Sequence, residues 1–242
     1  MAADVTTCVE VGASSVQTVL LGPGPQVEIF TGAQRPPAGS PLLIAVPGLI
    51  HGTRVVAASN VGWYDVDPAE ALGLPAPADF VCNDAEAAAV GESALRPGAP
   101  DLVFVGLGTG VGGAVVRDDS VQANLFAHLE GFSDRTCTCT RTGCLETIAG
   151  GWALPPTLSD ADLRAIARAL GDAVEREPLA APRLVVLAGG MSRAYPALLP
   201  LVQAALPRRT VEPSLARHAK SAAAWGLRHL WRQSAAAPVA GR

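Results

Sequence analysis

The sequence predicts an α/β protein, and three observations support this fold class. Apolar runs rich in β-branched residues recur along the chain and end in glycine or polar turns, as strands do. Segments with helical spacing of apolar residues follow several of these runs. With 242 residues, of which 49% are hydrophobic, the chain can bury the core of one large domain or of two modest ones.

The first half of the chain is predicted to form strands before it forms a helix. TCVEVG (7–12) and VQTVLLG (16–22) are β-rich runs, and the short Ala-Ser-Ser segment between them favours a tight hairpin. PLLIAVPG (41–48) and DFVCND (79–84) are predicted to be further buried strands. The second of these leads directly into AEAAAVGESAL (85–95), which is predicted to be a helix.

The second half alternates strands and helices around a cysteine-rich segment. LVFVGLGTGVGGAVVRDDS (102–120) predicts a strand, a glycine-rich turn and a second strand. LSDADLRAIARALGDAVERE (158–177) has helical spacing and an acidic start. RLVVLAGG (183–190) is predicted to be a strand that ends on two glycines and precedes a helix, and residues 214–233 are predicted to form a closing helix with an apolar face.

The segment HLEGFSDRTCTCTRTGCLE contains one histidine and three of the five cysteines. Cys137 and Cys139 flank one residue, Cys144 follows five positions later, and His128 precedes the group by nine. This Cys3His set suits a closed tetrahedral zinc site, in which the metal stabilises a loop without reacting. The alternative is a set of free or disulfide-bonded cysteines. The remaining two, at positions 8 and 82, lie in apolar runs and are predicted to be buried thiols.

Charge and hydropathy favour a cytoplasmic protein without nucleic-acid or membrane partners. The net charge is −4, and no block of lysine and arginine residues suggests binding to nucleic acid or to an anionic membrane surface. No basic segment followed by an apolar core begins the chain, and no apolar run approaches the length of a membrane helix. We also find no internal sequence repeat.

Glycines at strand ends suggest three places where backbone N–H groups could meet phosphate oxygens. These are residues 12–15, the GTGVGG segment at 108–113, and the glycine pair at 189–190. Each could equally be a plain tight turn. The GTGVGG segment is not a dinucleotide fingerprint, because a strand follows it, and it is not a Walker loop, because no Gly-Lys-Ser/Thr follows.

Two carboxylates are candidates for a catalytic or a binding role. Asp84 stands with Asn83 at the end of a predicted strand and the start of a predicted helix, where it is either a helix N-cap or a base that accepts a hydroxyl proton during phosphoryl transfer. Glu146 follows Cys144 by two positions, and it is either a surface carboxylate at a helix start or a group that the zinc loop carries into a cleft.

Taken in order, these segments resemble the ROK family of bacterial sugar kinases and repressors, members of the actin-like ATPase superfamily. VEVGASSVQTVLL resembles the first phosphate motif, AVPGLI and AASNVGW resemble elements near the sugar, and VCNDAEAAAVGE resembles the segment that carries the catalytic aspartate. GTGVGGAVV resembles the second phosphate motif, the cysteine segment resembles the zinc motif CxCGxxGCxE, and LAGGM resembles the adenosine motif.

The resemblance implies two actin-like (ribonuclease H-like) lobes, residues 1–97 and 98–242, with a nucleotide and sugar cleft between them. It implies ATP-dependent phosphorylation of a hexose or sugar-like polyol, with Mg²⁺ bound to the ATP phosphates and a structural Zn²⁺ ion. It also implies that a homodimer is possible. The implied base is Asp84, and the implied substrate contacts are Asn60, Asn83, Asp84, His128 and Glu146. The implied nucleotide contacts are Glu10, Gly12, Ser14, Gly108, Thr109, Gly110, Gly112, Gly189 and Gly190, and the implied zinc ligands are His128, Cys137, Cys139 and Cys144.

Several positions depart from the family pattern. Glu10 replaces the aspartate of the first phosphate motif, Leu125 replaces a sugar-binding glutamate, and Thr140 replaces the glycine after the second zinc cysteine. The stretch between Glu146 and Gly189 is short, which predicts a second lobe with fewer helices. Two hypotheses remain: a sugar kinase, or a catalytically weak relative that binds sugar or nucleotide as a sensor or partner protein. Only six or seven residues precede the first phosphate motif, so a DNA-binding repressor is not expected.

Overall fold

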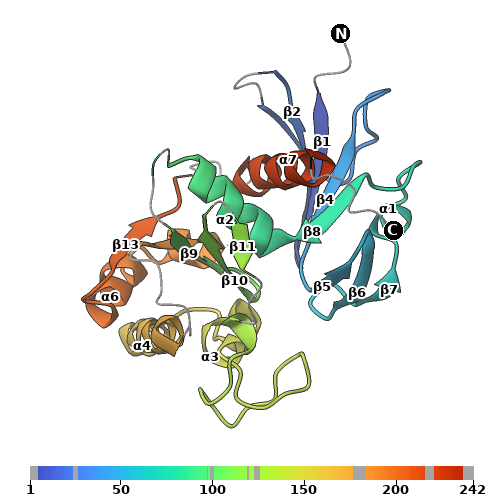
Figure 1. Cartoon of the computed structure of the whole chain (residues 1–242). Helices are drawn as coiled ribbons and strands as arrows, with labels where there is room; N and C mark the ends of the chain where they lie inside the picture. Colours follow the sequence, from blue (N-terminus) through green and yellow to red (C-terminus); the bar gives the residue numbers. More distant parts are fainter. Residues whose placement is uncertain are drawn as a thin grey trace, which may run out of the picture. The chain divides into compact units, whose positions relative to one another are not determined.

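The computed structural model of the chain describes residues 5–23, 27–96, 98, 101–118, 120–122, 126–176, 184–215 and 221–236 (Figure 1). The chain divides into two compact units, one made of Met1–Ala94 and Lys220–Arg242, the other of Leu95–Ala219. The two lobes predicted from the sequence, residues 1–97 and 98–242, would place the whole C-terminal part of the chain in the second unit. In the structure, the C-terminal helix α7 (Ser221–Ala236) instead packs within the first.

The first unit is built on a five-stranded sheet with the order β3-β2-β1-β4-β8. Its strands are β1 (Thr6–Val11), β2 (Val16–Leu21), β3 (Val27–Thr31), β4 (Leu42–Val46) and β8 (Phe80–Asn83). The predicted hairpin is confirmed, since β1 and β2 pair antiparallel. β1 is parallel to β4, and β4 is parallel to β8. The carboxyl ends of these three parallel strands therefore meet at one edge of the sheet.

A small second sheet and three helices complete the first unit. They are β5 (Leu49–His51), β6 (Arg54–Ala58), β7 (Trp63–Val66), α1 (Pro68–Ala71), α2 (Asp84–Ala94) and α7. The sequence did not predict β3, the small sheet or α1, because these elements are short and many of their side chains are exposed. The predicted helix at 85–95 is confirmed as α2.

Small residues allow α2 and α7 to pack closely against each other. A Cβ atom at Gly91 of α2 would overlap the carbonyl oxygen of Ala222, and one at Gly226 of α7 would overlap that of Ala87. The other face of α7 lies on the sheet beside β1 and β4, where Leu227 joins a buried cluster with strand residues (Figure 1). This apolar face explains why α7 returns to the first unit: its partners there are strands of the N-terminal sheet.

The second unit repeats the topology of the first sheet, with the strand order β11-β10-β9-β12-β13. Its strands are β9 (Leu102–Leu107), β10 (Val111–Arg117), β11 (Ser120–Gln122), β12 (Leu184–Ala188) and β13 (Thr210–Pro213). As in the first unit, the central strand has an antiparallel neighbour on one side and a parallel neighbour on the other. The main sheets of the two units thus share one topology although the sequence contains no visible repeat.

Helices of the second unit pack against this sheet and share a buried apolar cluster with its strands. They are the 3-10 turns η1 (Phe126–His128) and η2 (Gly151–Ala153), and the helices α3 (Glu146–Ala149), α4 (Asp160–Arg176), α5 (Gly190–Ala194) and α6 (Leu198–Ala205). The predicted helix at 158–177 is confirmed as α4, whose Ile166 and Leu170 are buried against the core. The single helix predicted after residue 190 is two, because Tyr195 precedes a proline and leaves helical geometry.

Between η2 and β12 the described residues form one long helix, α4, in line with the short connection that the sequence predicts. None of the helices in the described ranges is long and apolar enough to cross a membrane.

Candidate functional site

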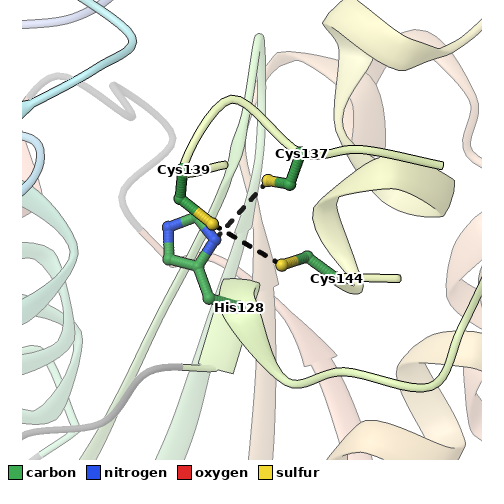
Figure 2. Close-up of side chains that lie close together, drawn as sticks. All are labelled: His128, Cys137, Cys139 and Cys144. Carbon is green, nitrogen blue, oxygen red and sulfur yellow. Dashed lines mark hydrogen bonds between the residues drawn. The ribbon is translucent and has the colours of Figure 1, made fainter. Parts of the chain in front are cut away.

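The four predicted zinc ligands come together at one point of the second unit. His128 ends η1, and the three cysteines lie in the segment that leads to α3, here called the metal loop (residues 129–145). Their ligand atoms all lie within 4.8 Å of one another, with Cys137 Sγ 3.7 Å from His128 Nδ1 and Cys139 Sγ 3.6 Å from Cys144 Sγ (Figure 2). Separations of about 3.3–3.8 Å are those of neighbouring ligands around a tetrahedral zinc ion.

The donor set and its electrostatics fit a divalent cation. All five cysteines are free, and Cys8 and Cys82 are buried as predicted. Burial raises the pKa of Cys144 to about 12 and lowers the pKa of His128. The imidazole is therefore neutral, which is its ligand form, and a cation would counter the cost of ionising the buried thiol. Three thiolates and one imidazole are a donor set that zinc prefers.

Backbone hydrogen bonds fold the metal loop into a tight turn around its cysteines. Cys137 N–H donates to the carbonyl of Arg141 at 2.7 Å, and Thr140 N–H donates to the carbonyl of Cys137 at 2.9 Å. Thr140 has φ 73°, a left-handed conformation that is costly for a β-branched residue. Gly143 has φ 78°, and a Cβ atom there would lie 2.6 Å from the carbonyl oxygen of Ser133. The glycine is therefore required, whereas the threonine is strained.

Arginines fasten the metal loop to its surroundings. Arg135 donates to the carbonyls of Thr147 and Ala153 at 2.9 and 3.0 Å, and its guanidinium lies 6.0 Å from the ring centroid of Trp152. Arg176 of α4 donates to the carbonyl of Glu130 at 2.8 Å. The sequence pattern does not mark these anchors, since isolated arginines in a loop are indistinguishable from solvated ones.

Glu146 is buried, with 1% of its surface exposed, and its carboxylate accepts hydrogen bonds from several groups of the protein, among them the Cys137 thiol at 3.9 Å. Oε2 accepts from Val111 N–H at 2.9 Å. Oε1 accepts from the Trp152 indole at 3.1 Å and from the Thr138 hydroxyl at 3.3 Å. A sugar contact by Glu146 stays a prediction. The structure shows in addition that this residue joins the metal loop to the strand after the glycine-rich turn.

The glycine turn, defined as residues 108–112, follows β9 and includes the first two residues of β10. Gly108 N–H donates to the carbonyl of Gly110 at 3.0 Å, which closes the turn. The carbonyls of Gly108 and Thr109 accept from Gly151 N–H at 3.0 Å and Trp152 N–H at 2.9 Å. The residues that follow α3 therefore support the turn. Nothing in the sequence pattern marked Gly151 and Trp152 for this role.

The glycine pair after β12 lies at the same sheet edge as the glycine turn. β12 is parallel to β9, with Ala188 opposite Gly106, so both strands end side by side. Gly189 has φ 99°, and a Cβ atom there would overlap the carbonyl oxygen of Leu107. Gly190 begins α5. Two of the three segments predicted to bind nucleotide are thus neighbours within the second unit.

In the first unit, Asn83 rather than Asp84 serves as the helix cap. Asn83 Oδ1 accepts from the N–H groups of Ala85 at 2.9 Å and Glu86 at 3.2 Å, which is the bonding of an N-cap. Its Nδ2 donates to the carbonyl of Gly48 at 3.0 Å. The amide therefore ties the start of α2 to the turn after β4, and its predicted sugar contact stays a prediction.

Asp84 is the first residue of α2 and is half-buried. Burial raises its pKa to about 6, an effect that a hydrogen bond from Ala85 N–H partly offsets. The carboxylate thus has a proton affinity suited to accepting a proton near neutral pH.

The first phosphate motif lies at the same sheet edge as Asp84. Glu10 in β1 is opposite Ala45 in β4, which is opposite Cys82 in β8. Glu10 Oε2 accepts a 2.5 Å hydrogen bond from Gln17, its partner across the hairpin. Gln17 holds the longer carboxylate in place, and no motif in the sequence marks this contact.

The remaining predicted residues lie in turns of the first unit. Gly12 N–H donates to the carbonyl of Ser15 at 2.8 Å and closes the β1–β2 hairpin, in which Ser14 is exposed. Asn60 is half-buried in the tight turn between β6 and β7. Leu125, the departure from the sugar-binding glutamate, lies outside the described residues.

Comparison with known proteins identifies the family. A model of the ROK family matches residues 31–176, which is more than half of the chain. The chain belongs to the ROK family. A ROK glucokinase from Streptomyces griseus, solved with glucose and AMPPNP, is similar in structure with a TM-score of 0.76 and 20% identity, over 95% of this chain and 99% of that one. This member therefore has the α/β, actin-like fold of the family.

Two curated proteins are similar to the chain over part of their length. The glucokinase of Halalkalibacterium halodurans is 33% identical over 122 residues, which are 44% of this chain and 36% of the relative. A putative xylose repressor of a Caldicellulosiruptor species is 33% identical over 126 residues, which are 46% of this chain and 31% of the relative. The chain spans about a third of the length of the curated relatives it matches, and these include both a kinase and a repressor.

Proposed function

We propose that this ROK protein transfers the γ-phosphoryl group of ATP to a hydroxyl of a hexose or sugar-like polyol. The similarity to glucokinases in sequence and in structure supports this class of reaction. The single observation that carries the proposal for the reacting group is the environment of Asp84. A cytoplasmic location and a homodimer stay predictions.

Asp84 is proposed as the general base. Because Asn83 caps α2, the helix does not need the Asp84 carboxylate for its N-terminus, and the aspartate can act on a substrate. A pKa of about 6 leaves Asp84 mostly ionised at neutral pH while keeping a useful affinity for a proton. It would take the proton of the sugar hydroxyl as that oxygen forms a bond to the γ-phosphorus. The bond between the γ-phosphorus and the bridging oxygen would break, and its electron pair would leave on ADP.

ATP with Mg²⁺ is proposed to bind through the glycine turn and the glycine pair. The contacts proposed in the second unit are Gly108, Thr109, Gly110, Gly112, Gly189 and Gly190, and those in the first are Glu10, Gly12 and Ser14. At such turns, backbone N–H groups can approach phosphate oxygens closely because no side chain intervenes. The parallel ends of β9 and β12 support a shared role for the two glycine segments.

Zinc is proposed to bind His128, Cys137, Cys139 and Cys144. When bound there, it supplies structural stabilisation and no redox or acid chemistry. His128 Nδ1 faces Cys137 Sγ, so Nδ1 would be the ligand and Nε2 would be left for a sugar hydroxyl. Asn60, Asn83 and Glu146 complete the proposed sugar contacts.

The second candidate function is a catalytically weak relative that senses sugar or nucleotide. The observation that favours it is the first phosphate motif, where Glu10 replaces aspartate and its carboxylate is bonded to Gln17. A remodelled carboxylate there could weaken Mg-ATP binding. The retained Asp84 favours the kinase.

A substrate panel separates the two functions. Purified zinc-loaded protein is incubated with Mg-ATP and hexoses, amino sugars or cyclitols, and ADP release is followed. The kinase predicts ADP release that depends on one class of sugar. ADP release with none of them, together with sugar or nucleotide binding by calorimetry, would favour the sensor instead.

A further inference from the structure

A buried carboxylate connects the metal loop to the glycine turn. Glu146 begins α3, two residues after Cys144. One of its oxygens accepts from Val111 N–H, in the residue that follows Gly110. The other accepts from Thr138, which lies between two of the proposed zinc ligands, and Cys137 Sγ lies 3.9 Å from the same oxygen. One side chain therefore contacts both segments directly.

Further hydrogen bonds fix the glycine turn to the residues just beyond α3. Gly151 N–H and Trp152 N–H donate to the two carbonyls of Gly108 and Thr109. A Cβ atom at Gly151 would lie 2.6 Å from Gly108 O, so the two backbones are in close approach. The Trp152 indole also donates to Glu146. The turn is thus held on both sides by groups that depend on the position of α3 and of Glu146.

We propose that Glu146 is a positioning residue that couples the fold of the metal loop to the shape of the glycine turn. A metal bound by Cys137 and Cys139 fixes Thr138 between them, and Thr138 and the indole then fix the carboxylate that holds Val111 N–H. Loss of the metal releases Thr138 and loosens the turn. Metal occupancy therefore sets the affinity for Mg-nucleotide, a consequence that rests on the proposed function, whereas the coupling itself does not.

The coupling is tested without any nucleotide by amide hydrogen exchange, followed by NMR. The reporter is Val111 N–H, and the control is the Val105 N–H in the centre of β9. In the wild-type protein, zinc removal by a chelator should raise the exchange rate of Val111 several-fold and leave Val105 unchanged. Equal protection of Val111 with and without zinc would overturn the proposal.

Two variants identify the group that transmits the change. Glu146→Gln keeps the size of the side chain, but its single acceptor oxygen cannot serve both Val111 N–H and the Trp152 indole. Thr138→Val removes the hydroxyl that donates to the carboxylate from the loop side, whereas Cys137 Sγ stays 3.9 Å from that oxygen. In both variants, the response of Val111 exchange to zinc should be lost or much reduced. A full response in both variants would show that Glu146 does not carry the coupling.

The functional consequence is measured as linkage between two ligands. Zinc affinity is determined by chelator competition with and without saturating Mg-ADP. The proposal expects nucleotide to raise the zinc affinity of the wild-type protein about fivefold or more, and that of Glu146→Gln hardly at all, because binding free energies are reciprocal. The quantity compared is the ratio of zinc affinities with and without Mg-ADP. This ratio excludes any direct effect that losing the Glu146 charge has on phosphate binding.

The outcomes separate this proposal from the proposed function. If Mg-ADP binds but leaves zinc affinity unchanged, the coupling to nucleotide is refuted and the kinase stands. If Mg-ADP does not bind at any attainable concentration, the kinase proposal is refuted, and the exchange of Val111 alone then decides whether Glu146 couples the two segments.

Discussion

Replacing Thr140 by glycine should tighten zinc binding, although the change removes a side chain. Thr140 has φ 73° in the turn that carries Cys137 and Cys139, and its side chain is exposed. An L-residue in this left-handed region costs about 1–2 kcal/mol relative to glycine. The substitution therefore relieves strain without opening a cavity.

The net gain is smaller than the strain because glycine also makes the open loop more flexible. That entropic cost is about 0.5–1 kcal/mol, which leaves a gain of about 0.5–1 kcal/mol for the closed loop. Because the closed loop and the bound metal form together, the gain appears in the binding constant. We expect Thr140→Gly to bind zinc roughly 2–5-fold more tightly than the wild-type protein.

Competition with a chromophoric zinc chelator measures this difference, and Thr136→Gly is the matched control. Thr136 lies in the same loop, paired with Thr142 in an isolated bridge, and its φ is not in the left-handed region. There glycine adds flexibility without relieving strain, so zinc affinity should fall. If both variants shift zinc affinity in the same direction, the strain at Thr140 has no energetic consequence and the reasoning is refuted.

Three further predictions concern the first unit. The stability of Asp84→Asn relative to the wild-type protein should rise by on the order of 1–2 kcal/mol from about pH 5 to about pH 8. The reason is that a carboxyl whose folded pKa is raised to about 6 destabilises the wild-type protein as pH rises through that value. Urea unfolding at both pH values measures the difference, and an equal difference at both contradicts the prediction. Gly226→Ala should destabilise the unit by about 2–3 kcal/mol, because the added Cβ atom would overlap the carbonyl oxygen of Ala87. The control variant Ser93→Ala on α2 should change stability little. Equal melting temperatures for the two variants would refute the close packing. Asn83→Ala should lower stability by about 1–2 kcal/mol in thermal unfolding, and unchanged stability would show that the cap is dispensable.

The sequence predicts the long, apolar elements of this fold well. β1, β4, β9 and β12 have fully or almost fully buried runs, and α4 has a clear apolar stripe, so local pattern and tertiary packing agree. The short strands β5 and β7 expose at least half of their residues and have no such pattern. The return of α7 to the first unit depends on contacts with strands some two hundred residues earlier, which no local pattern encodes.

For the candidate site as well, some features could be predicted from the sequence and others could not. Spacing alone predicted the set His128, Cys137, Cys139 and Cys144, and the structure does bring these four side chains together. Local spacing did not reveal that Asn83, one residue before Asp84, caps α2, nor that Glu146 is buried against Val111. Both depend on which backbone groups a fold brings near a side chain. Three-dimensional proximity between segments distant in sequence decided these roles.

Turnover by Asp84→Asn tests the central claim most directly. With the sugar that supports ADP release, the account predicts that Asp84→Asn binds sugar and Mg-ATP normally by calorimetry but loses most of its turnover, while Glu86→Gln on the same helix retains it. In the wild-type protein, the rate should fall as pH drops through about 6, where Asp84 becomes protonated. Retained turnover in Asp84→Asn, with a sugar bound as in the wild type, would contradict the assignment of Asp84 as the base.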